Sequence, residues 1–175
     1  MARRLRPACA ALLLCSALVA SHVFAAGPHE HGVVKLDVSI EGTRVSLLMD
    51  TPLANLVGFE RAPRTDAERQ RVDVAISALQ TVATMFRVDA AAGCTAGPVS
   101  LNASALESDK GGDAAHADLD ASYSFKCGKG APAFIDLRIF EAFPAVQRID
   151  VQLLAGAKPT KRTLTRPAAR LTLKP

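Results

Sequence analysis

Histidine is the residue type whose spacing in this chain points to chemistry. Beyond residue 25 the sequence holds three histidines, and two of them, His29 and His31, flank Glu30. Side chains two positions apart in an extended chain face the same side, so both imidazoles could reach one metal ion. His116 and Asp118 repeat this spacing further along. Three imidazoles and one carboxylate suit Zn²⁺, and Cu²⁺ or Ni²⁺ also accept such ligands. The pattern predicts a metal site formed by His29, His31, His116 and Asp118.

The same histidines would have no chemical role if they were ordinary surface residues, which is common for histidines near a terminus. Other chemistry has less support. The sequence has no glycine-rich phosphate loop, no Gly-x-Ser-x-Gly elbow and no His-Glu-x-x-His motif. Acidic residues such as Asp37 and Asp120 fall at outward strand positions, which is typical of a solvated face. We therefore expect a protein that is not an enzyme.

The first 25 residues are typical of a signal peptide. Three arginines precede an apolar run over residues 8–20, and the small residues Val23 and Ala25 suit a cleavage site, with cleavage after Ala26 as the alternative. The run is shorter than the roughly 20 residues that a membrane span needs, although an uncleaved anchor is the other interpretation. We expect one exported, periplasmic domain over residues 26–175, with no membrane insertion after cleavage.

Two cysteines, Cys94 and Cys127, remain outside the predicted leader. In an oxidising compartment such an even pair predicts a disulfide, and the 33 positions between them do not match the Cys-x-x-Cys spacing of redox sites.

Charge and composition argue against nucleic acid as a partner. Three of the 21 basic residues lie in the leader, which leaves 18 against 17 acidic residues and a net charge of +1. The chain has no tryptophan and one tyrosine, so an aromatic platform for stacked bases is not expected. With 175 residues, 49% of them apolar, the length and composition favour one folded domain.

Alternating apolar and polar residues predict the strands that would carry the site. Residues 34–40 and 45–49 alternate on either side of Glu41-Gly42, as in a β-hairpin. Similar patterns predict strands over residues 99–103, 119–127, 135–139 and 149–153, and a broken edge strand in the tail around Pro167.

One helix is predicted between these strands. Thr65 and Glu68 form a Thr-x-x-Glu capping box, and apolar residues from Val72 to Phe86 recur every three or four positions. This pattern indicates an amphipathic helix of about 20 residues. The expected fold is α+β: an antiparallel β-sheet of about five to six strands, with this helix packed on one face.

A shared metal site constrains the order of these strands. His29 and His31 precede the first strand, whereas His116 and Asp118 open the fourth. Both strand starts must therefore lie at one end of the sheet. Direct parallel pairing of the two strands would achieve this, as would a terminus that folds back across the sheet edge.

Several segments resemble the ZrgA-like family of periplasmic zinc-uptake proteins. They include His29-Glu30-His31-Gly32, residues 52–60 (PLANLVGFE), residues 123–127 (YSFKC) and residues 140–144 (FEAFP). The resemblance implies an exported zinc-binding protein that assists zinc import, with a component of a zinc importer as its partner. It also matches His29, His31 and His116 to histidines of the family.

Two departures from the family pattern limit what the resemblance implies. The family tends to read Gly-Phe-Glu-His, but here Arg61 follows Glu60 and places a permanent cation where a ligand would stand. The loop over residues 107–113 is acidic but contains no histidine. We therefore expect one zinc site rather than a high-capacity store. The alternative function is an envelope structural or interaction module with no metal role.

Overall fold

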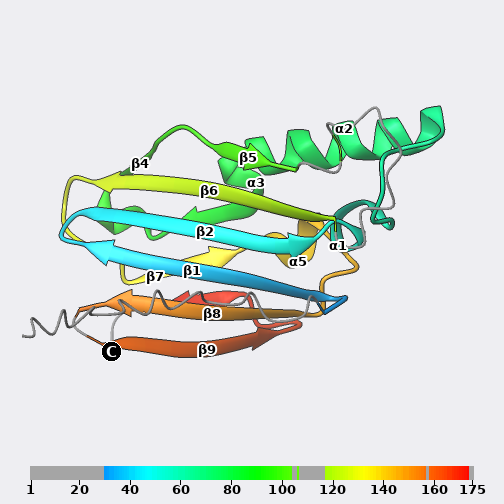
Figure 1. Ribbon diagram of the computed structural model, residues 1–175. Coiled ribbons are helices and arrows are strands. Elements are labelled where there is room, and N and C mark those ends of the chain that lie inside the picture. The colour runs from blue at the N-terminus through cyan, green and yellow to red at the C-terminus, as the bar shows by residue number, and fades with distance from the viewer. Residues whose placement is uncertain (1–29, 104–105, 107–116, 157, 174–175) are drawn as a thin grey trace, which may run out of the picture.

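The computed structural model describes residues 30–103, 106, 117–156 and 158–173. Within these residues the fold is α+β, and two β-sheets and short helices share one hydrophobic core (Figure 1). The large sheet contains β1 (Val33–Glu41), β2 (Arg44–Pro52), β4 (Cys94–Ala96), β5 (Ser100–Asn102), β6 (Asp118–Cys127), β8 (Arg148–Ala155) and β9 (Pro159–Thr165). The small sheet contains β3 (Phe86–Val88), β7 (Phe134–Leu137) and β10 (Arg170–Thr172). The helices are α1 (Ala54–Val57), α2 (Asp66–Gln80), α3 (Val82–Met85), α5 (Ile139–Ala142) and a 3₁₀ turn, Ala90–Ala92.

The large sheet is mixed, so the prediction of an antiparallel sheet is wrong in this respect. Its order is β4-β6-β2-β1-β8-β9, with β5 also paired to β6. All neighbours are antiparallel except β1 and β8, which run parallel from Val33 opposite Arg148 to Ile40 opposite Ala155. A parallel pair needs a long crossover connection. Here the connection contains strands β2 to β7 and the helices before the chain returns as β8.

The small sheet was not predicted. Residues 135–139 were expected to form a strand of the main sheet, but β7 pairs instead with β3 and β10, and Ile139 begins α5. The predicted broken edge strand becomes two strands, since β9 pairs with β8 and β10 pairs with β7. Alternation shows which side of a strand is apolar, but it does not identify the neighbouring strand.

The predicted helix of about 20 residues is also wrong in length. α2 has 15 residues and ends at Gln80, because Thr81 has an extended backbone and its hydroxyl donates to the Ser77 carbonyl at 2.9 Å. After the short helix α3, Phe86 continues into β3 and contacts Tyr123 edge to face. The predicted cap is present, since the Glu68 N–H donates to the Thr65 hydroxyl at 3.2 Å.

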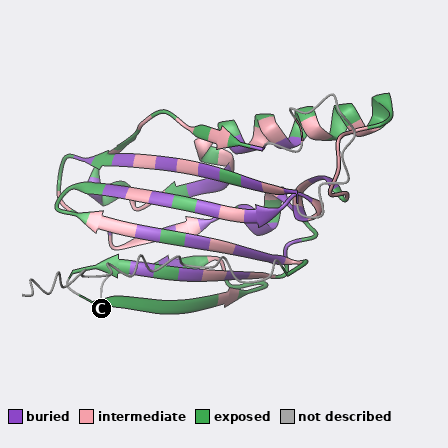
Figure 2. Ribbon diagram, in the orientation of Figure 1, coloured by how far each residue is buried: buried purple, intermediate pink, exposed green. Residues whose placement is uncertain are grey.

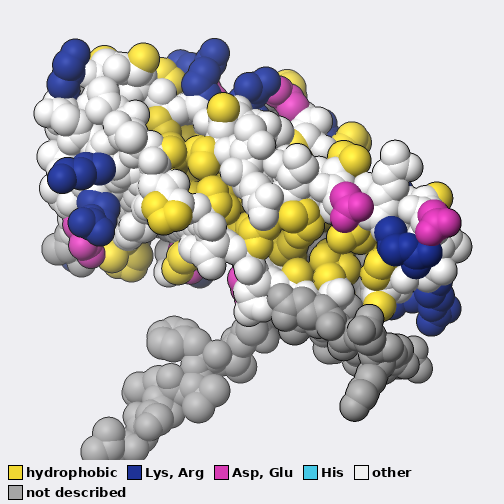
Figure 3. Space-filling view, turned by 90° about the horizontal axis from the view of Figure 1, so that it is seen from above, with side chains coloured by type: hydrophobic (Ala, Val, Ile, Leu, Met, Phe, Trp, Pro, Cys, Tyr) yellow, Lys and Arg dark blue, Asp and Glu magenta, His cyan; other side chains and the backbone are white. Residues whose placement is uncertain are grey.

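α2 does not cover a face of the large sheet along its whole length. Its first half extends beyond the end of the sheet (Figure 1), and Ala75 and Leu79 are its buried residues. The Tyr123 hydroxyl donates to the Leu79 carbonyl at 3.0 Å and so ties the end of the helix to β6. Seen from the side of α2 and β5, hydrophobic side chains lie between two charged ends (Figure 3).

The alternation of the strands is confirmed by burial. Leu36 and Val38 of β1 point into the core, whereas Asp37 between them is exposed, and β2, β6 and β8 alternate in the same way (Figure 2). The predicted disulfide is also present. Cys94 and Cys127 lie opposite each other in the β4–β6 register and are bonded. The bond therefore joins two neighbouring strands of the large sheet.

The predicted signal peptide lies outside the described residues. Within the described ranges, no helix is long and apolar enough to cross a membrane.

Candidate metal site

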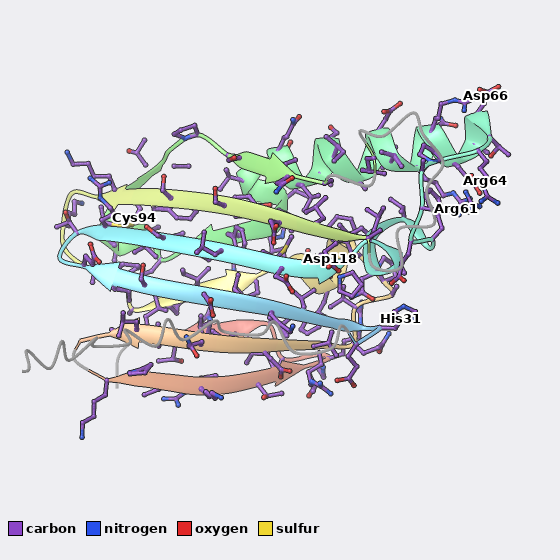
Figure 4. The ribbon with its side chains drawn as sticks, in the orientation of Figure 1. His31, Arg61, Arg64, Asp66, Cys94 and Asp118 are labelled. Atoms are coloured by element: carbon purple, nitrogen blue, oxygen red, sulfur yellow. A yellow bond between two sulfur atoms is a disulfide. The ribbon has the colours of Figure 1, made fainter. Side chains whose placement is uncertain are left out.

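The starts of β1 and β6 lie at the same end of the large sheet (Figure 4). β2 is antiparallel to both strands, so the two run in the same direction with β2 between them. Direct pairing of these strands, one of the two predicted arrangements, is therefore wrong. Their starts are two strand spacings apart, which is about 10 Å. This arrangement brings the segment of His31 and the segment of Asp118 to one edge of the protein.

The connection from β2 into α1 occupies the space between these two strand starts. Pro52 pairs with Asp118, and the Leu53 N–H donates to the Ala117 carbonyl at 2.8 Å. Asp118 is half-buried where β6 begins. Two other predicted ligands, His29 and His116, lie outside the described residues.

The backbone around His31 is held by a buried amide. Asn55 of α1 is 3% exposed, and its Oδ1 accepts from the Gly32 N–H at 2.6 Å. Its Nδ2 donates to the Val33 carbonyl at 2.8 Å and to the Thr51 hydroxyl at 3.0 Å. Gly32 has a φ of +80°, a backbone conformation that glycine adopts without strain. These contacts fix the residue after His31 against α1.

The residue before His31 is held as well. Glu30 forms an ion pair with Arg148 of β8, with Nη2 and Oε2 2.7 Å apart, and the Glu30 carbonyl accepts from the Val33 N–H. This hydrogen-bonded pair raises the pKa of Arg148 and directs the Glu30 carboxylate towards β8. Glu30 therefore anchors the segment and is not placed as a ligand.

His31 contacts a carboxylate that the sequence analysis did not select. Its Nε2 lies 2.8 Å from Oε1 of Glu60, in the segment after α1, and the two side chains are 72% and 30% exposed. An ionised carboxylate only accepts hydrogen bonds, so Nε2 carries the proton and donates. The Nδ1 atom of His31 is then the nitrogen that can bind a metal, as in carboxylate–histidine–zinc arrangements. The sequence feature that could have identified Glu60 is its position in the Gly-Phe-Glu segment, which resembles the ZrgA-like family.

Arg61 turns towards α2. Its Nη1 and Nη2 donate to the two carboxylate oxygens of Glu68 at 2.9 and 2.7 Å, and its guanidinium lies 5.1 Å from the Phe59 ring centroid. Hydrogen bonds from Arg61 and from the Arg64 N–H lower the pKa of Glu68 to about 2, so the carboxylate stays ionised. The permanent cation at the position where the family tends to carry a histidine therefore has a bidentate counter-ion.

The described residues by themselves do not complete a metal site. Among them, no group of three or more histidine, cysteine, aspartate or glutamate side chains is close enough to hold an ion. The ligand set His29, His31, His116 and Asp118 stays a prediction. What the described part contains is one imidazole, fixed by the backbone on both sides and oriented by Glu60.

Comparison with known proteins agrees with a role in metal handling. No curated protein matches the chain. A family model, described as the ZrgA family zinc uptake protein, matches residues 28–173, which is most of the chain and spans every residue of the candidate site. The chain belongs to the ZrgA family of zinc uptake proteins.

Proposed function

We propose that this protein is a non-enzymatic, periplasmic zinc-binding protein that carries or buffers zinc for an importer. The observation that carries the proposal is the His31–Glu60 contact at 2.8 Å, at the end of the sheet where β6 also begins. Membership of a zinc uptake family supports zinc as the cargo. His29, His116 and Asp118 are the proposed further ligands.

The exposure of His31 suits a protein that takes up and releases its cargo. With a 72% exposed side chain, the imidazole is open to an ion from solvent and to a receiving protein. The backbone of residues 30–33 is held by Arg148 and Asn55, so little ordering is needed when the ion binds. Zinc binds the neutral form of imidazole, and its affinity should therefore fall in acidic solution.

Calorimetry with Zn²⁺ on the leaderless, tag-free protein at about pH 7.5 tests the proposal. We expect saturable binding at one site, with a clear loss of affinity in His31→Ala. Glu41→Ala is the matched control, because Glu41 is an exposed acid at the opposite end of β1 and should leave binding unchanged. A dissociation constant above about 1 mM for the wild-type protein would contradict the proposal.

A second measurement separates the proposal from the alternative of an envelope interaction module. The variant with alanine at residues 29, 31 and 116 should lose capture of an importer component in the presence of zinc. Capture that persists in this variant with chelator present would favour the module with no metal role.

A further inference from the structure

Three charged side chains form one row across the small sheet. Arg87 of β3 and Arg170 of β10 both lie directly opposite Asp136 of β7. These residues belong to the second layer of the fold and have no part in the proposed zinc site. The row lies on strands that are far apart in sequence, and the tertiary structure assembles it.

Both guanidiniums converge on the single carboxylate. Arg87 donates from Nε and Nη2 to Oδ2 of Asp136 at 3.0 and 2.6 Å. Arg170 donates from Nε to Oδ1 at 2.7 Å and from Nη2 to Oδ2 at 3.0 Å. Asp136 is 13% exposed, whereas Arg87 and Arg170 are 70% and 54% exposed. The anion is thus covered, and the two cations face solvent.

One carboxylate balances one of the two arginines. The hydrogen bonds from Arg170 and Arg87 lower the pKa of Asp136 to about 2, which keeps it ionised. Asp89 lies outside the row and also acts on Arg170 as a nearby negative charge, while its oxygens accept from the Ala91 and Ala133 N–H groups. The row itself therefore carries a net charge of +1.

The two guanidiniums are held in fixed positions. The Arg170 guanidinium lies 3.8 Å from the Phe134 ring centroid and is bonded to Asp136 along one edge. Each arginine donates to Asp136 through the edge that carries Nε and Nη2. Within the described residues, no hydrogen bond involves Nη1 of Arg87 or Arg170. A planar guanidinium fork binds a second oxyanion through its remaining edge.

These two arginines line a cavity of about 450 Å³. Its other lining residues are Asp136, Arg138, Glu141 and Ala169. Arg138 and Glu141 pair with each other at 3.0 Å, so they leave the excess charge of the row unchanged. The volume lies in the range of small-molecule sites, but the lining is charged rather than apolar. A cavity of this kind suits a small, strongly charged ligand.

We propose that Arg87 and Arg170 form a binding site for a small oxyanion with at least two charged oxygens. Inorganic phosphate and a dicarboxylate such as succinate share this chemistry. Asp136 is the positioning residue, because it holds the two forks side by side. The site is separate from the zinc site and does not depend on it.

Titration of the leaderless, zinc-free protein with phosphate, and separately with succinate, tests this proposal by calorimetry at constant ionic strength. We expect saturable binding of at least one of the two anions. The anion with the higher affinity shows whether the site prefers the oxygens of a phosphate or those of a dicarboxylate. Arg87→Gln should weaken binding about tenfold or more. Arg87→Lys should weaken it as well, because the charge is retained but the fork is lost.

Arg162→Gln is the matched control, since Arg162 is an exposed arginine on β9 that does not line the cavity. Equal affinities for Arg87→Gln and Arg162→Gln would overturn the proposal, as would absence of binding of both anions to the wild-type protein. If the Arg87 variants fail to fold, Arg170→Lys is measured instead. Binding that survives in His31→Ala shows that the oxyanion site is independent of the zinc proposal.

Discussion

At the scale of single residues, Glu60 changes how the candidate zinc site is understood. Sequence spacing selected histidines and one aspartate, whereas the structure adds a carboxylate 2.8 Å from His31. Such a partner fixes which imidazole nitrogen is protonated and thereby which one can bind metal. Arg61, expected to weaken the site, is instead engaged by Glu68.

The first prediction at this scale concerns Glu60. Glu60→Ala should lower zinc affinity about 10-fold to 100-fold, the usual effect of losing a group that orients a metal-binding histidine. Glu60→Gln should lower zinc affinity less, because the amide oxygen of the glutamine still accepts from Nε2 of His31. Zinc calorimetry on both variants measures this, with Glu41→Gln at the other end of β1 as control. Unchanged affinity in Glu60→Ala would show that the contact has no role in binding.

At the scale of elements, ion pairs join segments that are distant in sequence. Glu68 connects the start of α2 to the segment after α1 through Arg61, and Asp136 connects three strands through Arg87 and Arg170. Both carboxylates have a pKa of about 2, lowered by their arginine partners. Their contribution to stability therefore depends on pH.

The second prediction follows from the sign of these shifts. A carboxylate whose pKa is lower in the folded state stabilises the fold above its unfolded pKa, which is 3.8 for Asp136 and 4.5 for Glu68. This stabilisation should disappear as the pH falls from about 4.5 towards 2. In urea denaturation, Asp136→Asn should be less stable than wild type at neutral pH, and the difference should shrink as pH falls through this range. A difference that is constant with pH would contradict the ionic explanation.

At the scale of the whole molecule, two sheets enclose one core, and the disulfide joins the last residue of β6 to the short edge strand β4. Among the described candidate zinc residues, His31 lies just before β1 and Asp118 begins β6 of the large sheet, whereas the arginine row belongs to the small sheet. The two proposed sites can therefore be altered separately.

The third prediction concerns the disulfide. Replacing both Cys94 and Cys127 with serine should lower the free energy of unfolding by about 3–4 kcal/mol, because the bond closes a loop of about 34 residues in the unfolded chain. Urea denaturation of the oxidised protein and of the double variant measures the loss. Reduced wild-type protein should resemble the variant, and equal midpoints for all three samples would contradict the prediction.

Structural features that are determined by a short segment of the chain, or by the number of residues of one type, were predictable from the sequence. The alternation in β1, β2, β6 and β8, the cap at Thr65 and the pairing of Cys94 with Cys127 all follow from local patterns or from residue counts. Local patterns suffice here because period-two burial, hydrogen bonding at a helix start and cysteine number are each set within a short segment or by composition.

The tertiary structure alone decided which segments meet. The parallel pairing of β1 with β8 and the separate sheet around β7 depend on packing between distant parts of the chain. The contact of His31 with Glu60 and the row of Arg87, Asp136 and Arg170 arise in the same way. The alternating pattern of a strand specifies which of its sides is apolar, but not which other strand it pairs with. The pairing depends on how much apolar surface all the helices and strands bury together in the core.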